Sequence, residues 1–393
     1  MIKFPQDFYW GSATSSHQVE GNNLHNDWWD WEQKGKTKER SGLACGHYVL
    51  YKEDFDLAKR LNHNAHRFSI EWSRIEPEEN KFDIKEIQHY KDVAIALRER
   101  NLEPIVTLNH FTLPLWFVKK GGWLNKNAEF YFLRYVEKIV SGLIAYVRYW
   151  VTLNEPLVYI YNAYVRGIWP PAQHSLFKAK KVWDNLVSSH VGAYKRIYNL
   201  YRVKGLDLPH ISIAKHMREF IPLNKNPYHR LNAFLKDYFF NFRLIDDLVR
   251  LKSLDFIGLN YYTVEFFPPY NKISQDIPKN NLGWPIYPEG LYSLLLRLKR
   301  YNLPVFILEN GISTDDDQER WTFISEHLKS LYQAMQQGVW VLGYLYWSLL
   351  DNFEWEKGFK PRFGLVEVDY KTYRRIIRES ANKFALVCKQ GTL

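Results

Sequence analysis

Eight short apolar runs recur along the chain, and each is followed by a longer stretch in which apolar and charged residues have the spacing of a helix. Bulky residues at consecutive positions are typical of parallel strands that are covered on both faces. No Gly/Ser-rich linker interrupts the series, so the pattern predicts one (β/α)8 barrel of the α/β class over residues 1–393, with the surplus length in loops. The expected strands are Tyr9 to Ala13, Ala65 to Ile70, Pro104 to Leu108, Tyr149 to Leu153, Ile211 to Lys215, Leu254 to Asn260, Val305 to Glu309 and Val341 to Trp347.

Composition excludes several classes of protein. The hydrophobic share of 46% and the charged share of 24% are those of a globular chain rather than a disordered one. Although the net charge is +10, Lys and Arg are spread along the chain, so we expect neither a nucleic-acid nor a membrane partner. Cys45 and Cys388 have no metal-ligand spacing, and the first residues have no apolar signal segment, so we expect a cytoplasmic protein without cofactor or metal.

Aromatic residues are unusually common: 15 Trp, 27 Tyr and 24 Phe. Most of these rings are expected to fill the core. The remainder offer flat apolar faces and polar edges, which are the features that bind a sugar ring.

Two glutamates stand at the ends of predicted strands. Glu155 lies in WVTLNEP (150–156), and Glu309 lies in FILENG (306–311). Burial disfavours an ionised carboxylate, so an acid in such a place is either paired with a cation or positioned for chemistry. Ion-paired scaffold acids are one interpretation; the other is an acid and a nucleophile that act together on a glycosidic bond.

Further polar and aromatic residues follow the predicted strands, and a barrel brings these strand ends to one mouth. A single His or Asn at a strand end is often only a satisfied core group, but seven of the eight strands show this pattern. The residues are Gln18, Glu20, Arg67, Asn109, His110, Asn154, Asn260, Tyr262, Trp347, Glu354 and Trp355. The acidic run Asp315 to Asp317 is expected to begin a helix from about Gln318 to Gln337, with a metal site as the alternative.

An ordered set of motifs covers nearly the whole chain. It comprises FPQDFYWGSATSSHQVEG (4–21), HRFSI (66–70), TLNHF (107–111), WVTLNEP (150–156), DFIGLNYY (255–262), LENG (308–311) and YWSLLDNFEW (346–355). In these runs the chain resembles glycoside hydrolase family one, the retaining β-glucosidase group. The resemblance implies a β-glycosidase that hydrolyses small β-glucosides, with β-galactosides and β-fucosides as further candidates, and that needs no cofactor.

The resemblance also implies catalytic roles. Glu155 would be the general acid and base, protonated at rest, and Glu309 would be the nucleophile that forms a covalent glycosyl-enzyme. Arg67 and Tyr262 would favour the ionised form of Glu309. Pro156 is expected to keep the backbone of Glu155 extended.

Substrate contacts follow in the same way. Gln18, His110, Asn154, Asn260 and Glu354 would hold the hydroxyls of the terminal sugar, Trp347 would lie beneath its ring, and Trp355 would donate its indole N–H. Related phospho-glycosidases have Ser, Lys and Tyr where this chain has Glu354, Pro361 and Phe363. A carboxylate repels a phosphate, so we expect a neutral sugar.

Some positions depart from the family pattern: Asn109 and Phe111 beside His110, and Leu308 before Glu309. Asn109 is expected either to reach the substrate through water or to satisfy a loop backbone. The segment 205–252 and the loop after Tyr262 look short, which leaves the leaving-group preference open. The remaining hypotheses are a transglycosylase of the same mechanism and a sugar-binding protein without catalysis; the presence of both glutamates disfavours the latter.

Overall fold

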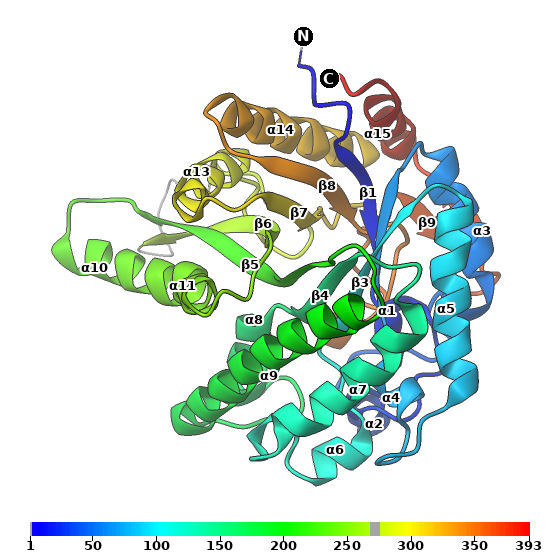
Figure 1. The fold of residues 1–393 in the computed structure, drawn as a ribbon. Coiled ribbons are helices and arrows are strands. Elements are labelled where there is room, and N and C mark those ends of the chain that lie inside the picture. Colours follow the sequence, from blue (N-terminus) through cyan, green and yellow to red (C-terminus); the bar gives the residue numbers. More distant parts are fainter. Residues whose placement is uncertain (1, 268–275) are drawn as a thin grey trace.

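Eight parallel strands form a closed barrel in the computed structural model, which describes residues 2–267 and 276–393. The order follows the sequence, and the last strand pairs with the first through Tyr9 and Gly343 to Ala13 and Trp347, so no edge is left open (Figure 1). This TIM barrel confirms the predicted fold class. The strands are β1 (Tyr9–Ala13), β2 (Ala65–Ser69), β3 (Glu103–Asn109), β4 (Tyr149–Asn154), β5 (His210–Pro222), β6 (Ile257–Phe267), β7 (Val305–Asn310) and β8 (Val341–Trp347).

All eight strands lie where the sequence predicts them; six agree to within one residue at each end, and two differ by more. β5 and β6 continue past the barrel and pair from Glu219 and Val264 to Pro222 and Phe267. β6 also begins three residues later than predicted, and Asp255, two residues before it, accepts a hydrogen bond from the backbone N–H of Ile211 with its side chain. The short loop expected after Tyr262 therefore begins only after β6 ends at Phe267. Residues 268–275 of this loop lie outside the described residues.

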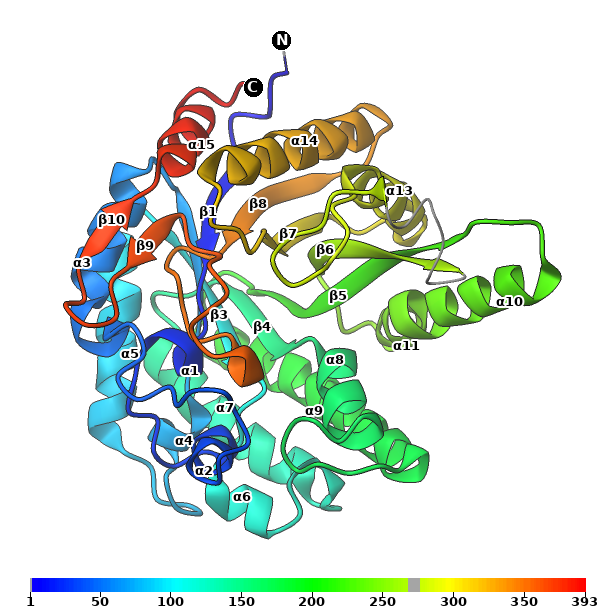
Figure 2. The same cartoon turned by 180° about the vertical axis from the view of Figure 1, so that it is seen from behind.

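Helices surround the barrel, and Figure 2 shows them from the other side, with β5, β6 and α10 projecting to the right of the barrel. The helices are α1 (Ser16–Val19), α2 (Asp27–Gln33), α3 (His47–Arg60), α4 (Trp72–Ile75), α5 (Ile84–Glu99), α6 (Leu115–Lys119), α7 (Ala128–Leu143), α8 (Pro156–Ile160), α9 (Leu176–Val203), α10 (Pro227–Lys236), α11 (Arg243–Arg250), α13 (Pro288–Leu298), α14 (Asp317–Gln336) and α15 (Glu379–Gln390). Single turns of 3-10 or π-helix are η1 (Gly122–Leu124), η2 (Tyr161–Val165), η3 (Asp237–Phe242), η4 (Lys299–Tyr301) and η5 (Trp355–Lys357), and a two-stranded sheet joins β9 (Val366–Val368) to β10 (Arg375–Ile377).

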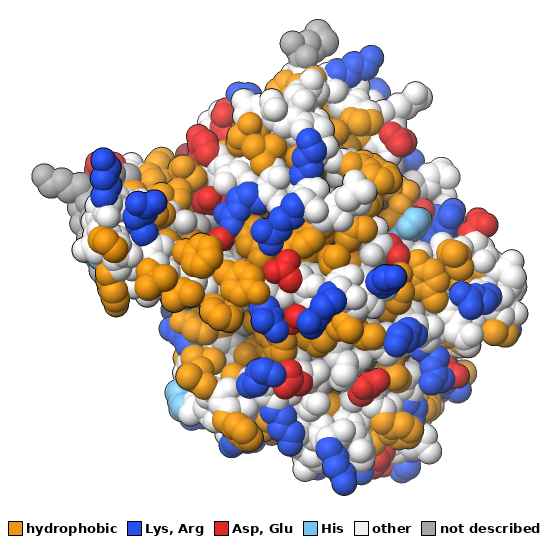
Figure 3. Space-filling view, turned by 60° about the vertical axis from the view of Figure 1, so that its left-hand side comes forward, with side chains coloured by type: hydrophobic (Ala, Val, Ile, Leu, Met, Phe, Trp, Pro, Cys, Tyr) orange, Lys and Arg blue, Asp and Glu red, His pale blue; other side chains and the backbone are white. Residues whose placement is uncertain are grey.

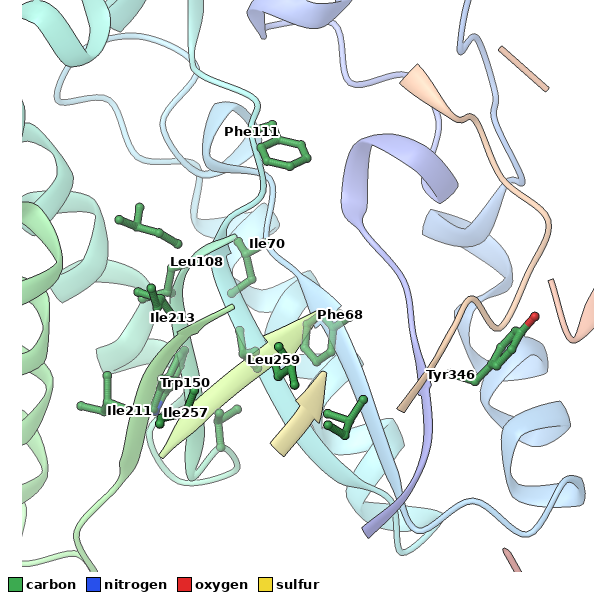
Figure 4. Close-up of a cluster of buried hydrophobic side chains, with 14 of the residues drawn as sticks. Phe68, Ile70, Leu108, Phe111, Trp150, Ile211, Ile213, Ile257, Leu259 and Tyr346 are labelled. Carbon is green, nitrogen blue, oxygen red and sulfur yellow. The ribbon is translucent and has the colours of Figure 1, made fainter. Parts of the chain in front are cut away.

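The core explains why the strands are apolar at consecutive positions. Phe68, Trp150, Ile213 and Leu259 belong to the large cluster between strands and helices (Figure 4). A second cluster is formed by the alternate residues of the strands and includes Ile105, Val151, Phe306, Leu308 and Leu345. Both faces of each strand are thus buried, as in other parallel barrels.

The three aspartates at the start of α14 have structural partners, and Asp315 accepts a hydrogen bond from Asn281 at 3.0 Å. Asp316 caps the helix by accepting hydrogen bonds from the N–H groups of Gln318 and Glu319, while Asp317 pairs with Arg320 at 3.0 Å. Among the residues that the structure describes, no group of three or more His, Cys, Asp or Glu side chains is arranged to hold a metal ion. None of the described helices is both long enough and apolar enough to cross a membrane.

Candidate active site

The C-terminal ends of the strands surround a cavity of about 900 Å³. Nine of the eleven residues predicted for the site line it: Gln18, His110, Asn154, Glu155, Tyr262, Glu309, Trp347, Glu354 and Trp355. The other two, Arg67 and Asn260, are fully buried behind the wall, and each binds one of the glutamates. The structure therefore brings these eleven residues together. Glu20, which the strand-end pattern also included, does not line the cavity and pairs with Arg74 at 3.1 Å instead.

Glu309 is held by groups that favour its ionised form. Arg67 donates from Nη1 to Oε1 at 2.5 Å, and the Tyr262 hydroxyl donates to Oε2 at 2.6 Å. Gly311 follows two residues later because the chain passes very close to β8 there: a Cβ at this position would lie 1.8 Å from the carbonyl oxygen of Trp347. The LENG motif therefore supplies the Glu309 carboxylate and, two residues later, a glycine at the position where β8 leaves no room for a side chain.

The backbone of Glu155 is not extended, contrary to the sequence-based expectation. Glu155 has φ 42° and ψ 57°, in the left-handed region. The reason is that β4 ends at Asn154 and α8 begins at Pro156, so a single residue must turn the chain from strand to helix. A non-glycine residue in this region carries strain on the order of 1–3 kcal/mol, which the surrounding fold must offset.

The side chain of Glu155 has two neighbours, and one of them was missed from the sequence. Asn260 donates from Nδ2 to Oε1 at 2.7 Å, so Asn260 binds the acid directly. His216 Nδ1 lies 3.5 Å from the same oxygen. His216 belongs to β5, the one strand for which the sequence analysis named no functional residue. The signal was present, because the run KHMR (215–218) places three basic side chains at this strand end.

Protons are unequally distributed over the two glutamates. Burial raises the pKa of Glu309 to about 7, although the Arg67 charge lowers it, and the Glu155 carboxylate adds to the rise. Burial also acts to raise the pKa of Glu155, but the charge and hydrogen bonding of His216, the hydrogen bond from Asn260 and the charge of Lys215 together outweigh it and leave this pKa below its ordinary value of 4.5. The pair therefore keeps one shared proton up to about pH 7.

The two pKa shifts favour a protonated Glu309 and an ionised Glu155, whereas the sequence predicts the reverse. The protonation state of His216 explains the difference. Burial lowers the pKa of His216 itself, which favours the neutral ring near pH 7. A neutral His216 no longer stabilises the ionised form of Glu155, whereas the Arg67 cation still stabilises the ionised form of Glu309. We therefore assign the shared proton to Glu155 when His216 is neutral.

A polar wall lies beside the two glutamates. The Gln18 amide donates from Nε2 to Glu354 Oε2 at 3.2 Å, which links α1, just after β1, to the loop after β8. The amide of Asn154 and the Nε2 atom of His110 lie 3.1 Å apart, and the Nδ1 atom of His110 is buried with no hydrogen-bond partner. An unpaired buried nitrogen of this kind favours a ligand that supplies a partner.

Glu354 differs from the ionised carboxylate that the sequence analysis assumed. Burial raises the pKa of Glu354 to about 8, and the carboxylates of Glu356, Glu309 and Glu155 add to the rise. The free protein at neutral pH therefore holds a mostly protonated Glu354, which weakens the argument that its charge repels a phosphate. Of its two expected companions, Phe363 lines the cavity, whereas Pro361 is buried away from it.

Aromatic rings, among them those of Phe111, Trp347 and Trp355, form the apolar side of the inner cavity. The ring of Trp347 stacks with that of His110 at a centroid distance of 6.0 Å, and Phe111 packs against Trp355 at 5.3 Å. Phe111, a departure from the family pattern, is thus part of the cavity wall.

The other two departures lie away from the cavity. Asn109 donates to the carbonyl of Thr112 at 2.9 Å, which favours the loop-backbone alternative. Leu308 lies in the core inside the barrel, so it does not line the cavity.

Comparison with known proteins agrees with this geometry. The sequence model described as Glycosyl hydrolase family 1 matches residues 1–252 and 244–392. The chain belongs to glycosyl hydrolase family 1. Over its full length it is 33% identical to β-glucosidase A of Thermotoga maritima, with 99% of that protein covered.

Solved structures of the family are similar over the whole chain. A β-glycosidase from Pyrococcus horikoshii has a TM-score of 0.91 and 41% identity, with 100% of this chain and 96% of that chain covered. A β-glucosidase from T. maritima in complex with glucoimidazole has a TM-score of 0.93 and 31% identity, with both chains fully covered. The chain is therefore a family 1 glycoside hydrolase, a β-glycosidase similar to β-glucosidases.

Proposed function

We propose that this family 1 enzyme removes terminal non-reducing β-D-glucosyl residues with retention of configuration, through a covalent glycosyl-enzyme. Glu309 attacks the anomeric carbon while Glu155 gives its proton to the departing glycosidic oxygen. In the second step Glu155 takes a proton from water, water attacks the same carbon, and the Glu309 carboxylate leaves. Water and glycoside are thus converted to sugar and alcohol, and both glutamates return to their starting states.

One observation carries the proposal: the two glutamates have different partners. Glu309 is bound by a permanent cation and a hydroxyl donor, so its carboxylate is ready to form a bond to carbon. Glu155 is bound by an amide and lies beside a titratable histidine, so it can gain and lose a proton. Unequal surroundings of this kind divide acid and nucleophile roles between two carboxyl groups.

The choice of glucose rests on the polar wall and on the glucoimidazole complex of the T. maritima relative. A panel of aryl β-glucosides, β-galactosides and β-fucosides would test it, and we expect the highest kcat/KM with the glucoside. Proton NMR of the first-formed sugar should show the β-anomer. If the α-anomer forms first, the two-step mechanism is wrong.

Loss of the shared proton should limit activity at high pH. The pair loses this proton near pH 7, so kcat/KM for an alkyl β-glucoside should fall about tenfold per pH unit above that value. Aryl glucosides with an acidic leaving group need no proton from the enzyme, so their kcat/KM should fall much less. Rates from pH 4 to 9 would be measured for both, with Glu155→Gln as the control that lacks the acid. An alkyl-glucoside profile that stays flat to pH 9 contradicts the assignment.

Glu354→Ser should weaken glucoside hydrolysis. A neutral carboxyl that makes two hydrogen bonds to sugar hydroxyls contributes roughly 1–3 kcal/mol, so we expect kcat/KM to fall by about one to two orders of magnitude. Because the raised pKa favours the neutral carboxyl, the matched variant Glu354→Gln should lose less than Glu354→Ser. Neither variant should gain useful activity on a 6-phosphoglucoside, since no donor replaces the carboxyl. Wild-type preference for the 6-phosphoglucoside would overturn the choice of a neutral sugar.

A further inference from the structure

The imidazole ring of His216 lies between a carboxyl group and a guanidinium group. On one side its Nδ1 atom is 3.5 Å from Oε1 of Glu155, and on the other side Arg218 donates from Nε to Nε2 at 3.0 Å. Only 6% of His216 is exposed, so its protonation depends on these neighbours rather than on bulk water. Because Arg218 donates the hydrogen, Nε2 must be the acceptor, and the ring hydrogen of a neutral His216 lies on Nδ1.

Arg218 is held at both its backbone and its side chain. The side chain of Asn241 accepts from the backbone N–H of Arg218 at 3.1 Å and donates to its carbonyl at 2.7 Å. At the far end, Nη1 of Arg218 lies 3.8 Å from Glu265, which also pairs with Lys236 at 2.5 Å. A guanidinium stays charged over the whole working pH range. A doubly protonated His216 would turn a second N–H and a second positive charge towards it, so this contact favours the neutral ring.

Other charged groups near His216 act in both directions. Burial has the largest effect and lowers the pKa of His216, the Glu155 carboxylate acts to raise it, and the charges of Arg218 and Lys215 lower it. Lys215 also donates from Nζ to the backbone carbonyl of His216. The remaining titratable groups close by are Tyr262 on β6, whose ring stacks with His216 at 5.8 Å, Glu309 on β7, which is coupled to Glu155, and Arg166 after η2, which lies near Arg218. On the outer face that carries α10 and α11, Lys and Arg side chains are scattered among acidic and hydrophobic ones (Figure 3), so the near neighbours set the charge at His216.

The same geometry indicates which oxygen of Glu155 carries its proton. Oε1 faces two N–H groups, Nδ2 of Asn260 at 2.7 Å and Nδ1 of His216 at 3.5 Å, so Oε1 acts as an acceptor. Oε2 has no hydrogen bond to any residue in the described part of the chain, and Glu155 lines the cavity. The proton of the acid therefore lies on Oε2, from which it can reach a glycosidic oxygen.

We propose that Arg218 holds His216 as the neutral Nδ1–H tautomer and thereby keeps the catalytic proton on Oε2 of Glu155, so that both are positioning residues for the acid. The inference rests on the proposed function, because it concerns the proton that this reaction transfers. Without the Arg218 contact, His216 can take a proton at Nε2 and competes for it with Glu155. A cationic ring beside a carboxylate then replaces a neutral ring beside a carboxylic acid. The number of protons is the same in both states, but only the carboxylic acid can protonate the departing oxygen.

The tautomer can be measured without an activity assay. Nitrogen-15 NMR of enzyme labelled at histidine distinguishes an Nδ1–H ring, an Nε2–H ring and a doubly protonated ring. Comparison with His216→Asn identifies the signals of His216 among the 13 histidines. We expect the neutral Nδ1–H form at pH 6 in the wild type and a largely protonated ring in Arg218→Met. An Nε2–H or doubly protonated His216 in the wild type would overturn the inference.

Kinetics at pH 6 test whether the tautomer matters for the acid. Each unit by which the pKa of His216 exceeds that of Glu155 leaves about tenfold less protonated Glu155. We therefore expect Arg218→Met to lower kcat/KM for methyl β-glucoside about tenfold. The loss for 2,4-dinitrophenyl β-glucoside should be much smaller, because its leaving group needs no proton from the enzyme. Circular dichroism would check that the variant is folded.

Matched variants show whether Arg218 acts through His216. His216→Asn cannot hold the proton, so adding Arg218→Met to it should change kcat/KM for methyl β-glucoside by less than about twofold. Arg166→Met is the control for charge alone, because Arg166 lines the same cavity without a hydrogen bond to His216. It should also change this kcat/KM by less than about twofold.

Two failures are distinguishable. If Arg218→Met slows both glucosides equally, or slows methyl β-glucoside as much in the His216→Asn background as in the wild type, Arg218 does not act through His216. The inference is then wrong and the proposed function stands. If the wild type hydrolyses no β-glucoside, the proposed function itself is wrong, and the NMR spectra still decide the tautomer.

Discussion

Glu309→Gly should abolish hydrolysis of every β-glycoside while leaving the barrel folded. The expected loss in kcat is on the order of 10⁵ to 10⁶, the size seen when a covalent nucleophile is removed. No other described side chain takes its place, because Arg67 and Tyr262 direct their donors to the Glu309 carboxylate alone among the acids of the cavity. Circular dichroism would check the fold, and release of 4-nitrophenol would measure the rate.

Rescue by a small anion sharpens this test. Azide or formate should enter the space left by the Glu309 side chain and restore part of the activity with an activated aryl β-glucoside. Azide would then attack from the side of the lost carboxylate and give the α-glucosyl azide. Glu265→Gly, which removes another carboxylate of the same cavity, should keep near-normal aryl-glucosidase activity. Near-normal turnover by Glu309→Gly without added anion would remove the two-step mechanism.

Glu155→Ala should harm substrates unequally. Leaving groups that need a proton lose a factor of roughly 100 to 10,000, whereas activated aryl groups depart without help. Aryl glucosides should therefore release a rapid burst of phenol and then turn over slowly, because no base activates the water that attacks the glycosyl-enzyme. The measurement is kcat/KM for a series of aryl glucosides of rising phenol pKa.

The anomer of the glucosyl azide formed distinguishes the roles of the two glutamates. In Glu155→Ala the nucleophile is intact, so azide should attack the glycosyl-enzyme from the opposite face and give the β-glucosyl azide. An equal loss across leaving groups of different basicity, or formation of the α-azide, would show that Glu155 is not the acid and base.

The sequence predicts the barrel well because its signals are local. Each strand buries bulky residues on both faces, so a run such as Val305 to Glu309 indicates a parallel strand without knowledge of its neighbours. The ends of β5 and β6 are different, since they pair with each other beyond the barrel, and their length depends on that pairing rather than on composition.

Site residues were predictable where strand ends and motifs coincide, as at Asn154, Glu155 and Glu309. His216 was missed although the basic run KHMR (215–218) marks its strand, because the sequence does not show that β4 and β5 bring His216 close to Glu155. The raised pKa of Glu354 has the same origin, since burial and three carboxylates from other parts of the chain cause it. Residue types are therefore readable from the sequence, but protonation states depend on neighbours that only the fold supplies.

Arg67 makes activity a reporter of folding. From β2 it donates to Thr107 on β3 at 2.9 Å, to Asn154 on β4 at 2.7 Å, and to Glu309 on β7, which is 242 residues away in sequence. Contacts over such separations form late, because the intervening chain must first be brought together. A refolding sample should therefore regain its helical circular dichroism before it regains turnover, and the interval between the two signals would time the closure of the ring of strands.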